Sequence, residues 1–424
     1  MSHSRFVSRE TFIAALRGAT VVALGLGAAA FVPAGENWSR FRGPNGSGVA
    51  RDVAFPAVWT EDDYQWKVTL PGKGHSSPIG WEGKLFLTSG DAATGELMLI
   101  ALDAATGKSL WEQRFASTAQ SQHAANSYAS STCAADAQRV YLVWAGPESL
   151  QLAALDHDGD EAWRRDLGPL DARHGFGVSP ILVDDMVIVA NDHSGESFVT
   201  ALGARDGEPR WRRRRAAGTE SYATPAVWRG DGGGAHIIVN STAEGMAGLA
   251  PADGSVLWQL PAVFPARCVA SPIVVDDLVM GGSGEGGNGK SFVAVRPATA
   301  VGAEAQVAYE VKKSIPQVPT PVALGELLFI WNDRGVVSCC DLATGNVHWT
   351  ERVGGNYYSS PIVAGEKLYG IAADGQAVVL AATAKYQLLG RNSLGEAASA
   401  TPAVHQGKMY LRTETSLACL APAK

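Results

Sequence analysis

The segment Leu102-Asp103-Ala104-Ala105-Thr106-Gly107-Lys108-Ser109-Leu110-Trp111 recurs, with the same turn and the same aromatic end, as Cys340-Asp341-Leu342-Ala343-Thr344-Gly345-Asn346-Val347-His348-Trp349. In each copy the Asp can accept hydrogen bonds from backbone N–H groups two or three residues further on. The Gly after the Thr supplies the positive φ that closes a tight turn. The segment therefore predicts a turn into a strand whose Trp can wedge against a neighbouring unit.

Eight apolar runs along the chain open with a Ser/Thr-Pro-like pair, and consecutive pairs lie 40 to 55 residues apart. The pairs are Ser77-Pro78, Thr132-Cys133, Ser179-Pro180, Thr224-Pro225, Ser271-Pro272, Thr320-Pro321, Ser360-Pro361 and Thr401-Pro402. Each belongs to a unit with an aromatic marker on its predicted outer strand, and the markers are Trp66, Trp111, Trp163, Trp211, Trp258, Tyr309, Trp349 and Tyr386. This period is typical of stacked supersecondary units, and four short strands per unit, arranged radially, form a β-propeller.

The sequence thus predicts an all-β, eight-bladed β-propeller of four-stranded antiparallel blades. Seven blades with an odd outer unit is the alternative, since Thr132-Cys133 is the one degenerate pair. The chain enters the repeats on an outer-type strand at residues 66–70 and ends on a third-type strand at residues 416–421. We expect the N-terminal strand to join the last blade, which removes an exposed sheet edge.

The predicted domain boundaries are a signal peptide at residues 1–34, a lead-in segment at 35–65 and the propeller at 66–424. In residues 1–34, positive charges at Arg5, Arg9 and Arg17 flank an apolar stretch at 19–32. That stretch is shorter than the roughly 20 residues of a membrane helix, although an uncleaved anchor touching the membrane is the alternative. Glu10 replaces the second arginine of a twin-arginine signal, so we expect the general secretory route and a periplasmic or cell-envelope location.

Composition narrows the class of partner. The 48 glycines and 21 prolines suit many tight turns between short strands. The formal net charge is −7 at pH 7, whereas a general nucleic-acid surface needs a positive field. We therefore expect no nucleic-acid partner.

The five cysteines are an odd number, so at least one is unpaired within the chain. They lie in apolar strand patterns, at Cys133, Cys268, Cys339, Cys340 and Cys419. Because free Cys behaves as a small buried hydrophobe, we expect the fold to be held by its core and its closure.

The pattern Ala/Leu-x-Asp-x-x-Thr-Gly-x-x-x-Trp, as in residues 101–111, resembles the repeat of the pyrroloquinoline-quinone (PQQ)-type propellers. That superfamily contains the quinoprotein dehydrogenases and the propeller lipoprotein of the outer-membrane assembly machine. The resemblance covers about residues 66–421, and residues 37–46 are similar to the lead-in of exported quinoprotein-like repeat proteins of bacteria. It implies either a binding or scaffold propeller or a PQQ-dependent dehydrogenase with calcium that oxidises an alcohol or sugar.

Some quinoprotein dehydrogenases carry a disulfide between adjacent cysteines, and Cys339-Cys340 is superficially similar. The pair lies in a predicted third strand, at residues 336–341, whose side chains alternate between the two faces. A disulfide between neighbours would distort that strand, so the sequence favours a structural role for both thiols.

In this strand order, the loops from each outer strand to the next inner strand gather around the axis at one face. They contain ionisable or hydrogen-bonding side chains, namely His75, His123, Asn126, Tyr128, Arg173, His174, Glu220, Tyr222, Arg267, Lys313, Asn356 and Tyr357. A concave surface with convergent polar groups is a candidate ligand-binding funnel. Chance surface residues are the alternative, and a metal held by the histidines matches no known ligand spacing.

Short loops and the lack of a Cys-x-x-Cys-His haem-attachment motif favour a non-catalytic module. A quinone enzyme needs a general base and carboxylate ligands for calcium, and Glu220 is the one carboxylate among these candidates. We expect no catalytic residue, no bound metal and no cofactor, with an envelope protein, a peptide or a small ligand as partner. The alternative remains PQQ with calcium.

Overall fold

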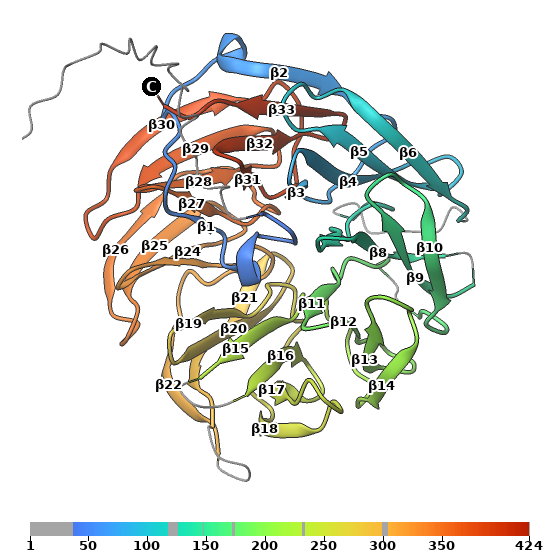
Figure 1. Cartoon of the computed structure of the whole chain (residues 1–424). Coiled ribbons are helices and arrows are strands. Elements are labelled where there is room, and N and C mark those ends of the chain that lie inside the picture. The colour runs from blue at the N-terminus through green and yellow to red at the C-terminus, as the bar shows by residue number, and fades with distance from the viewer. Residues whose placement is uncertain are drawn as a thin grey trace, which may run out of the picture. The chain divides into compact units, whose positions relative to one another are not determined.

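The computed structural model describes residues 37–117, 126–146, 148–171, 174–230, 234–298 and 304–423. Their main strands form eight sheets arranged radially around one axis (Figure 1), which confirms the eight-bladed propeller. No helix among these residues is long and apolar enough to cross a membrane. The predicted signal peptide, residues 1–34, lies outside the described residues.

The first four blades follow one another along the chain, each running from an inner to an outer strand. Blade 1 contains β3 (Ile79–Trp81), β4 (Lys84–Gly90), β5 (Leu97–Asp103) and β6 (Ser109–Phe115). Blade 2 contains β7 (Ala134–Ala135), β8 (Arg139–Ala145), β9 (Leu150–Asp156) and β10 (Glu161–Asp166). Blade 3 contains β11 (Ile181–Val183), β12 (Met186–Asn191), β13 (Phe198–Gly203) and β14 (Pro209–Arg214). Blade 4 contains β15 (Ala226–Arg229), β16 (Ala235–Ser241), β17 (Gly245–Leu249) and β18 (Val256–Leu260).

The remaining blades complete the circle. Blade 5 contains β19 (Ile273–Val275), β20 (Leu278–Glu285), β21 (Asn288–Arg296) and β22 (Gln306–Glu310). Blade 6 contains β23 (Val322–Leu324), β24 (Leu327–Trp331), β25 (Val336–Asp341) and β26 (Val347–Arg352). Blade 7 contains β27 (Ile362–Ala364), β28 (Lys367–Ile371), β29 (Gln376–Ala381) and β30 (Leu388–Ser393). Blade 8 contains β31 (Ala403–His405), β32 (Lys408–Arg412), β33 (Ser416–Leu420) and the N-terminal strand β2 (Tyr64–Thr69).

Blade 8 closes the ring as the sequence predicts. Strand β2 pairs antiparallel with β33, placing Trp66 opposite Cys419. Arg412 on β32 reaches across to blade 1, where its Nη1 donates to the carbonyl of Ser76 at 2.8 Å and its Nη2 donates to Ser89 Oγ at 3.1 Å. Backbone pairing and a buried guanidinium therefore join the two ends of the chain.

The Ser/Thr-Pro-like pairs link neighbouring blades by hydrogen bonds. In seven consecutive pairs the backbone N–H donates to the hydroxyl oxygen of the next pair, at 2.9 to 3.1 Å. The accepting side chains form what we call the hydroxyl ring: Thr132, Ser179, Thr224, Ser271, Thr320, Ser360 and Thr401. The bond recurs because blades 2 to 8 each present a Ser or Thr hydroxyl at the equivalent position, whereas Ser77 Oγ of blade 1 has no hydrogen-bond partner among the described residues.

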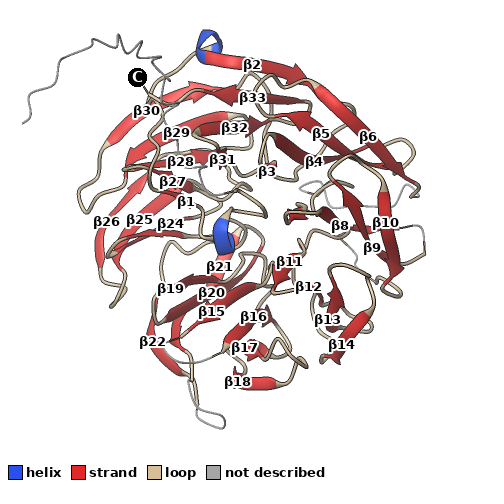
Figure 2. Ribbon diagram, in the orientation of Figure 1, coloured by secondary structure: helices blue, strands red, loops and turns tan. Residues whose placement is uncertain are grey.

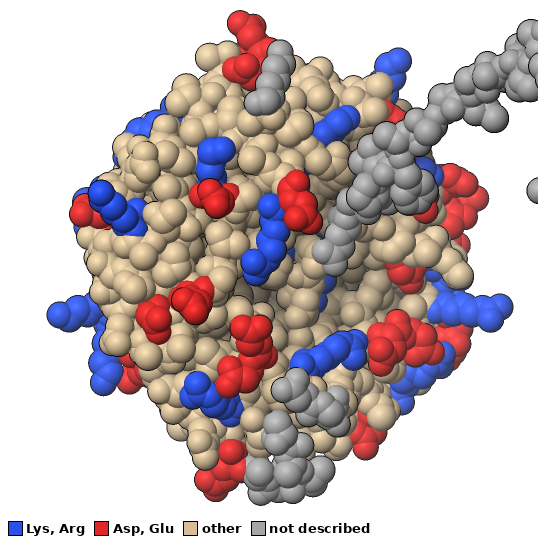
Figure 3. All heavy atoms as spheres, turned by 60° about the vertical axis from the view of Figure 1, so that its left-hand side comes forward, with Lys and Arg blue, Asp and Glu red and all other residues tan. Residues whose placement is uncertain are grey.

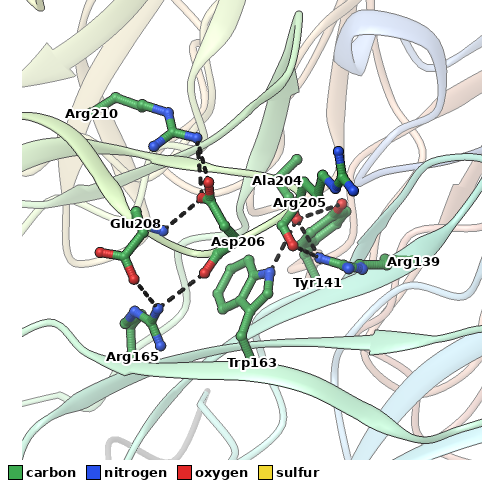
Figure 4. Close-up of polar contacts among 9 residues, drawn as sticks. All are labelled: Arg139, Tyr141, Trp163, Arg165, Ala204, Arg205, Asp206, Glu208 and Arg210. Atoms are coloured by element: carbon green, nitrogen blue, oxygen red, sulfur yellow. Dashed lines mark hydrogen bonds and ion pairs between the residues drawn. The ribbon is translucent and has the colours of Figure 1, made fainter.

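Six of the eight aromatic markers dock on the turn of the next blade, whereas Trp258 donates to Nδ1 of His236 in its own blade at 3.0 Å. Trp163 donates its Nε1–H to the carbonyl of Ala204 at 3.0 Å, and Tyr141 donates to the same oxygen (Figure 4). A Cβ added at Gly207 of that turn would lie 2.5 Å from the ring of Trp163. The turn glycine is therefore required twice, for its φ of 68° and for the close approach of the indole.

The prediction of Tyr386 as the aromatic marker of blade 7 is wrong. Seven of the eight directly follow a β-bulge on the outer strand, as Trp349 does opposite Cys339. In blade 7 the equivalent residue is Gly390, opposite Val379, while Tyr386 lies before β30 and packs against Trp349 at 5.3 Å. The lead-in segment covers this vacant position, since a Cβ on Gly390 would lie 2.0 Å from the carbonyl of Ala57.

The lead-in segment also crosses the axis, a path that the sequence did not indicate. Residues 38–50, here called the axial plug, include the 3-10 helix η1 (Pro44–Gly46), which Figure 2 shows at the centre of the ring, and β1 (Val49–Ala50), which pairs parallel with β27. The second 3-10 helix, η2 (Glu61–Asp63), precedes β2. The axial plug forms hydrogen bonds with five blades. For example, the Trp38 carbonyl accepts the Gly80 N–H at 2.9 Å, and the Gly48 carbonyl accepts the Val363 N–H at 2.8 Å.

Two arginines anchor the axial plug. Arg42 has no exposed surface and donates to five backbone carbonyls, including those of Thr320 and Pro361, each at 3.0 Å. Arg40 donates to the carbonyl of Pro225 at 2.6 Å. Burial lowers the pKa of each guanidinium to about 9, so both remain charged at neutral pH.

Candidate functional site

A cavity of about 640 Å³ lies on the axis, at the face where the outer strands return to the inner strands. All seven members of the hydroxyl ring line it, and Phe41 of the axial plug contributes to its wall. The hydroxyl ring residues are buried, and the loops above them carry larger polar side chains. The cavity is thus a polar funnel set on a rigid circle of inner strands.

Five of the predicted funnel residues line this cavity: His75, Asn126, His174, Arg267 and Asn356. Tyr222, which belongs to the same predicted loops, lines it as well. Two other predicted residues, His123 and Arg173, lie outside the described residues. The structure therefore brings together side chains from blades that are far apart in sequence.

Four predicted residues lie elsewhere. Tyr128 lines a separate small depression with Trp144 and Phe176. Lys313 is exposed and away from the cavity wall. Tyr357 is buried and packs against Trp331, with ring centroids 5.0 Å apart.

The fourth, Glu220, lies behind the cavity wall. Its Oε2 is 3.1 Å from Nη2 of Arg267, and its Oε1 is 3.8 Å from Nδ1 of His174. Glu220 thus supports two lining side chains. The phenol of Tyr222 is close enough for the Glu220 charge to help burial raise its pKa.

Several lining residues were not predicted because they belong to a second set of loops. Gly286, Gly287, Asp333 and Arg334 all lie between the second and third strands of their blades. In an antiparallel meander that connection ends on the same face as the connection to the next blade. The hairpin turns at residues 286–287 and 333–334 could have been assigned to the funnel on that ground.

Asp333 is the second carboxylate of the site. Its oxygens accept the backbone N–H groups of Gln317 at 2.7 Å and Val318 at 3.1 Å. Burial nevertheless raises the pKa of Asp333, because it outweighs these hydrogen bonds. The argument from a single carboxylate, Glu220, is therefore wrong, although Asp333 is already used to hold the loop that contains Gln317.

The thiols behave as the sequence predicts. All five are buried and unpaired, and Cys339 and Cys340 lie in the regular strand β25. Burial raises the pKa of Cys339 to about 12 and that of Cys340 to about 11. Neither cysteine lines the cavity.

A thiol titration tests this arrangement. In the native protein a small aromatic disulfide reagent should label none of the five cysteines, because buried, protonated thiols react poorly. In denaturant without reductant, all five should react. A count of three in denaturant would show that two cysteines form a disulfide and would contradict the structure.

Comparison with known proteins gives the family. A family model described as outer membrane protein assembly factor BamB matches residues 58–231, 150–383 and 305–423. No curated protein matches the chain.

Three similar solved structures share the fold. BamB from Moraxella catarrhalis is 14% identical, with a TM-score of 0.61 over 84% of this chain and 96% of that one. The quinohemoprotein alcohol dehydrogenase ADHIIG from Pseudomonas putida HK5 is 12% identical, with a TM-score of 0.66 over 92% and 81%. A europium-containing methanol dehydrogenase is 12% identical, with a TM-score of 0.62 over 90% of each chain.

At such identities these structures show the fold alone. The matches to the family model, in contrast, overlap one another and together extend from residue 58 to residue 423. The chain therefore belongs to the family of PQQ-like repeat β-propellers whose model carries the BamB description.

Proposed function

We propose that this protein is an exported, non-catalytic propeller of the cell envelope, a binding or scaffold module whose axial cavity takes a ligand. The observation that carries the proposal is the cavity of about 640 Å³, where polar side chains from most blades converge on a rigid ring. The family description and the export-like N-terminus support an envelope location.

The outer surface fits a role that is not nucleic-acid binding. Figure 3 shows Lys and Arg interspersed with Asp and Glu over the face in view, without a large patch of one sign. On the outer strand β14 the arginines have acidic neighbours, as in the pair of Arg210 with Asp206 at 2.8 Å. The arginines at residues 212–214 are therefore part of a mixed-charge edge, which discourages pairing between sheets, whereas Arg215 is buried and paired with Asp192 at 2.9 Å.

A quinone-dependent enzyme would need free carboxylate donors in the cavity to hold calcium. Asp333 is engaged by two backbone N–H groups, and Glu220 is paired with Arg267. No cluster of three or more His, Cys, Asp or Glu residues suited to a metal occurs in the described parts of the chain. The adjacent cysteines are buried in blade 6, away from the cavity. These residues do not fit a calcium-bound quinone, and we propose no redox step.

Ligand retention tests the proposal. Purified protein is mixed with a protein-free extract of the envelope, passed through gel filtration, and the retained small molecules are identified by mass spectrometry. Wild type should retain a defined compound, and the double variant Asn356→Ala/Tyr358→Ala should lose about tenfold or more, because hot-spot truncations cost that much. Both residues line the cavity, so the change leaves the core intact.

The control is Asn346→Ala, an exposed turn residue at the opposite end of blade 6. It should retain the compound as wild type does. Equal retention by the double variant, or no retained compound at all, would contradict the proposal. Dye reduction after adding PQQ and calcium would establish the dehydrogenase instead.

A further inference from the structure

The hydroxyl ring has hydrogen-bond donors to spare. Each of its oxygens accepts a backbone N–H from the preceding blade. A Ser or Thr hydroxyl also carries one hydrogen to donate. Among the described residues none accepts a hydrogen bond from these seven hydroxyls, although all seven residues line the cavity. The base of the cavity is therefore a circle of O–H groups in need of an acceptor.

Two buried guanidinium groups are hydrogen-bonded to backbone carbonyls of the segments that carry this circle. Arg42 donates to the carbonyl of Thr320, itself a member of the hydroxyl ring, and Arg40 donates to Pro225, which follows Thr224. The described acceptors of both guanidinium groups are neutral backbone carbonyls. A buried charge without a counter-ion is costly, so an anion placed near these groups gains from both.

The cavity wall carries further positive charge. Arg267 and Arg334 line it, and neither is buried beyond the reach of a ligand. Two carboxylates oppose them, Asp333 in the wall and Glu220 behind it, while Arg40 and Arg42 add two buried guanidinium groups that do not themselves line the cavity. The whole chain has a formal net charge of −7. The axial cavity is therefore locally positive in a negative protein, which favours entry of an anion.

We propose that the axial cavity binds its ligand through an oxyanion group, a phosphate or a carboxylate, which accepts hydrogen bonds from the hydroxyl ring and lies above Arg40 and Arg42. Arg267 and Arg334 then neutralise the outer part of the ligand. Hydroxyl and guanidinium donors are the groups that bind such oxygens best. This inference rests on the proposed function for the existence of a ligand, and it adds the chemistry by which that ligand is held.

Calorimetric titration tests it with inorganic phosphate, acetate and glucose as probes, at an ionic strength held constant with sodium chloride. Thr224→Val removes one ring hydroxyl at nearly constant shape, and Thr224→Ser keeps it. Arg334→Gln removes an exposed lining charge, while Arg214→Gln removes an exposed charge on the outer strand β14, away from the cavity. We expect Thr224→Val and Arg334→Gln to weaken anion binding about tenfold, Thr224→Ser to bind more tightly than Thr224→Val, and the control Arg214→Gln to bind as wild type.

The outcomes separate the sources of the oxyanion. Binding of phosphate alone assigns a phosphate group, binding of acetate alone assigns a carboxylate, and binding of both supports either. Failure of both anions, equal binding of glucose, or unchanged affinity in Arg334→Gln overturns the inference. Retention of an uncharged envelope compound in the same cavity would overturn it too, while leaving the proposed function standing.

Discussion

Replacing Arg42 with methionine should lower the free energy of unfolding by about 3–5 kcal/mol, since loss of a buried hydrogen-bond network has effects of this size. The guanidinium donates to five carbonyls drawn from the axial plug and from blades 6 and 7. Methionine keeps the apolar stem but leaves these carbonyls unpaired in a place closed to water. Relief of the buried charge offsets only part of that loss.

Urea unfolding followed by tryptophan fluorescence measures the change. Arg42→Lys is the informative companion, because it keeps the charge and cannot reproduce the planar fork of donors; its loss should fall between wild type and methionine. Arg51→Met, at an exposed position just after β1, is the control and should unfold as wild type does. A loss of about 0.5 kcal/mol or less for Arg42→Met, the size of an ordinary surface effect, would show that the plug does not hold the ring together.

Changing Gly207 to alanine should cost about 2–4 kcal/mol, the sum of an unfavourable positive φ and an overpacked contact. The glycine has a φ of 68°, and the added Cβ would lie 2.5 Å from Cδ2 of Trp163. Because Trp163 is tied to the carbonyl of Ala204 on the same turn, the indole cannot withdraw without losing that bond. The two blades must then separate slightly.

Two other glycines separate the causes. Gly325 has a φ of 56° with no atom within 4 Å of an added Cβ, so Gly325→Ala measures the backbone term alone. Gly83 has equal space and an ordinary φ, so Gly83→Ala should be close to neutral. Thermal unfolding of the three variants should rank Gly207 as the most damaging and Gly83 as the least. Equal losses at Gly207 and Gly325 would mean that the indole contact contributes nothing.

The sequence predicted what repeats. Three features recur because neighbouring blades pack in the same way: the Ser/Thr-Pro-like pairs, the Asp-x-x-Thr-Gly turns and most aromatic markers. Trp163 of blade 2 packing on Gly207 of blade 3 is an example. Closure through residues 66–70 followed from counting strands. Tyr386 was misassigned because Gly390 carries no side chain, and a residue from outside the repeats, Ala57, fills the place.

The path of the axial plug could not be read from the sequence. Residues 38–50 have no counterpart in the repeats, so no register relates them to a blade. Nothing in the sequence distinguishes Arg42 from a surface arginine. Its five carbonyl partners belong to the plug itself and to segments about 280 to 320 residues away, which only the folded structure brings together. Only part of the funnel was predicted, for example Arg267 and Asn356, because the prediction used the loops between blades and left out the hairpins between the second and third strands.

The long sequence separations between these partners also set the order in which the chain can fold during synthesis. Residues 38–50 leave the ribosome well before their partner Pro361, 319 positions later, and β2 must wait still longer for β33. Contacts so distant in sequence form late and slowly. During synthesis the first blades therefore persist as an open arc with an unpaired flank, the kind of intermediate that associates with copies of itself. A chaperone that shields unpaired strands would be needed most at that stage.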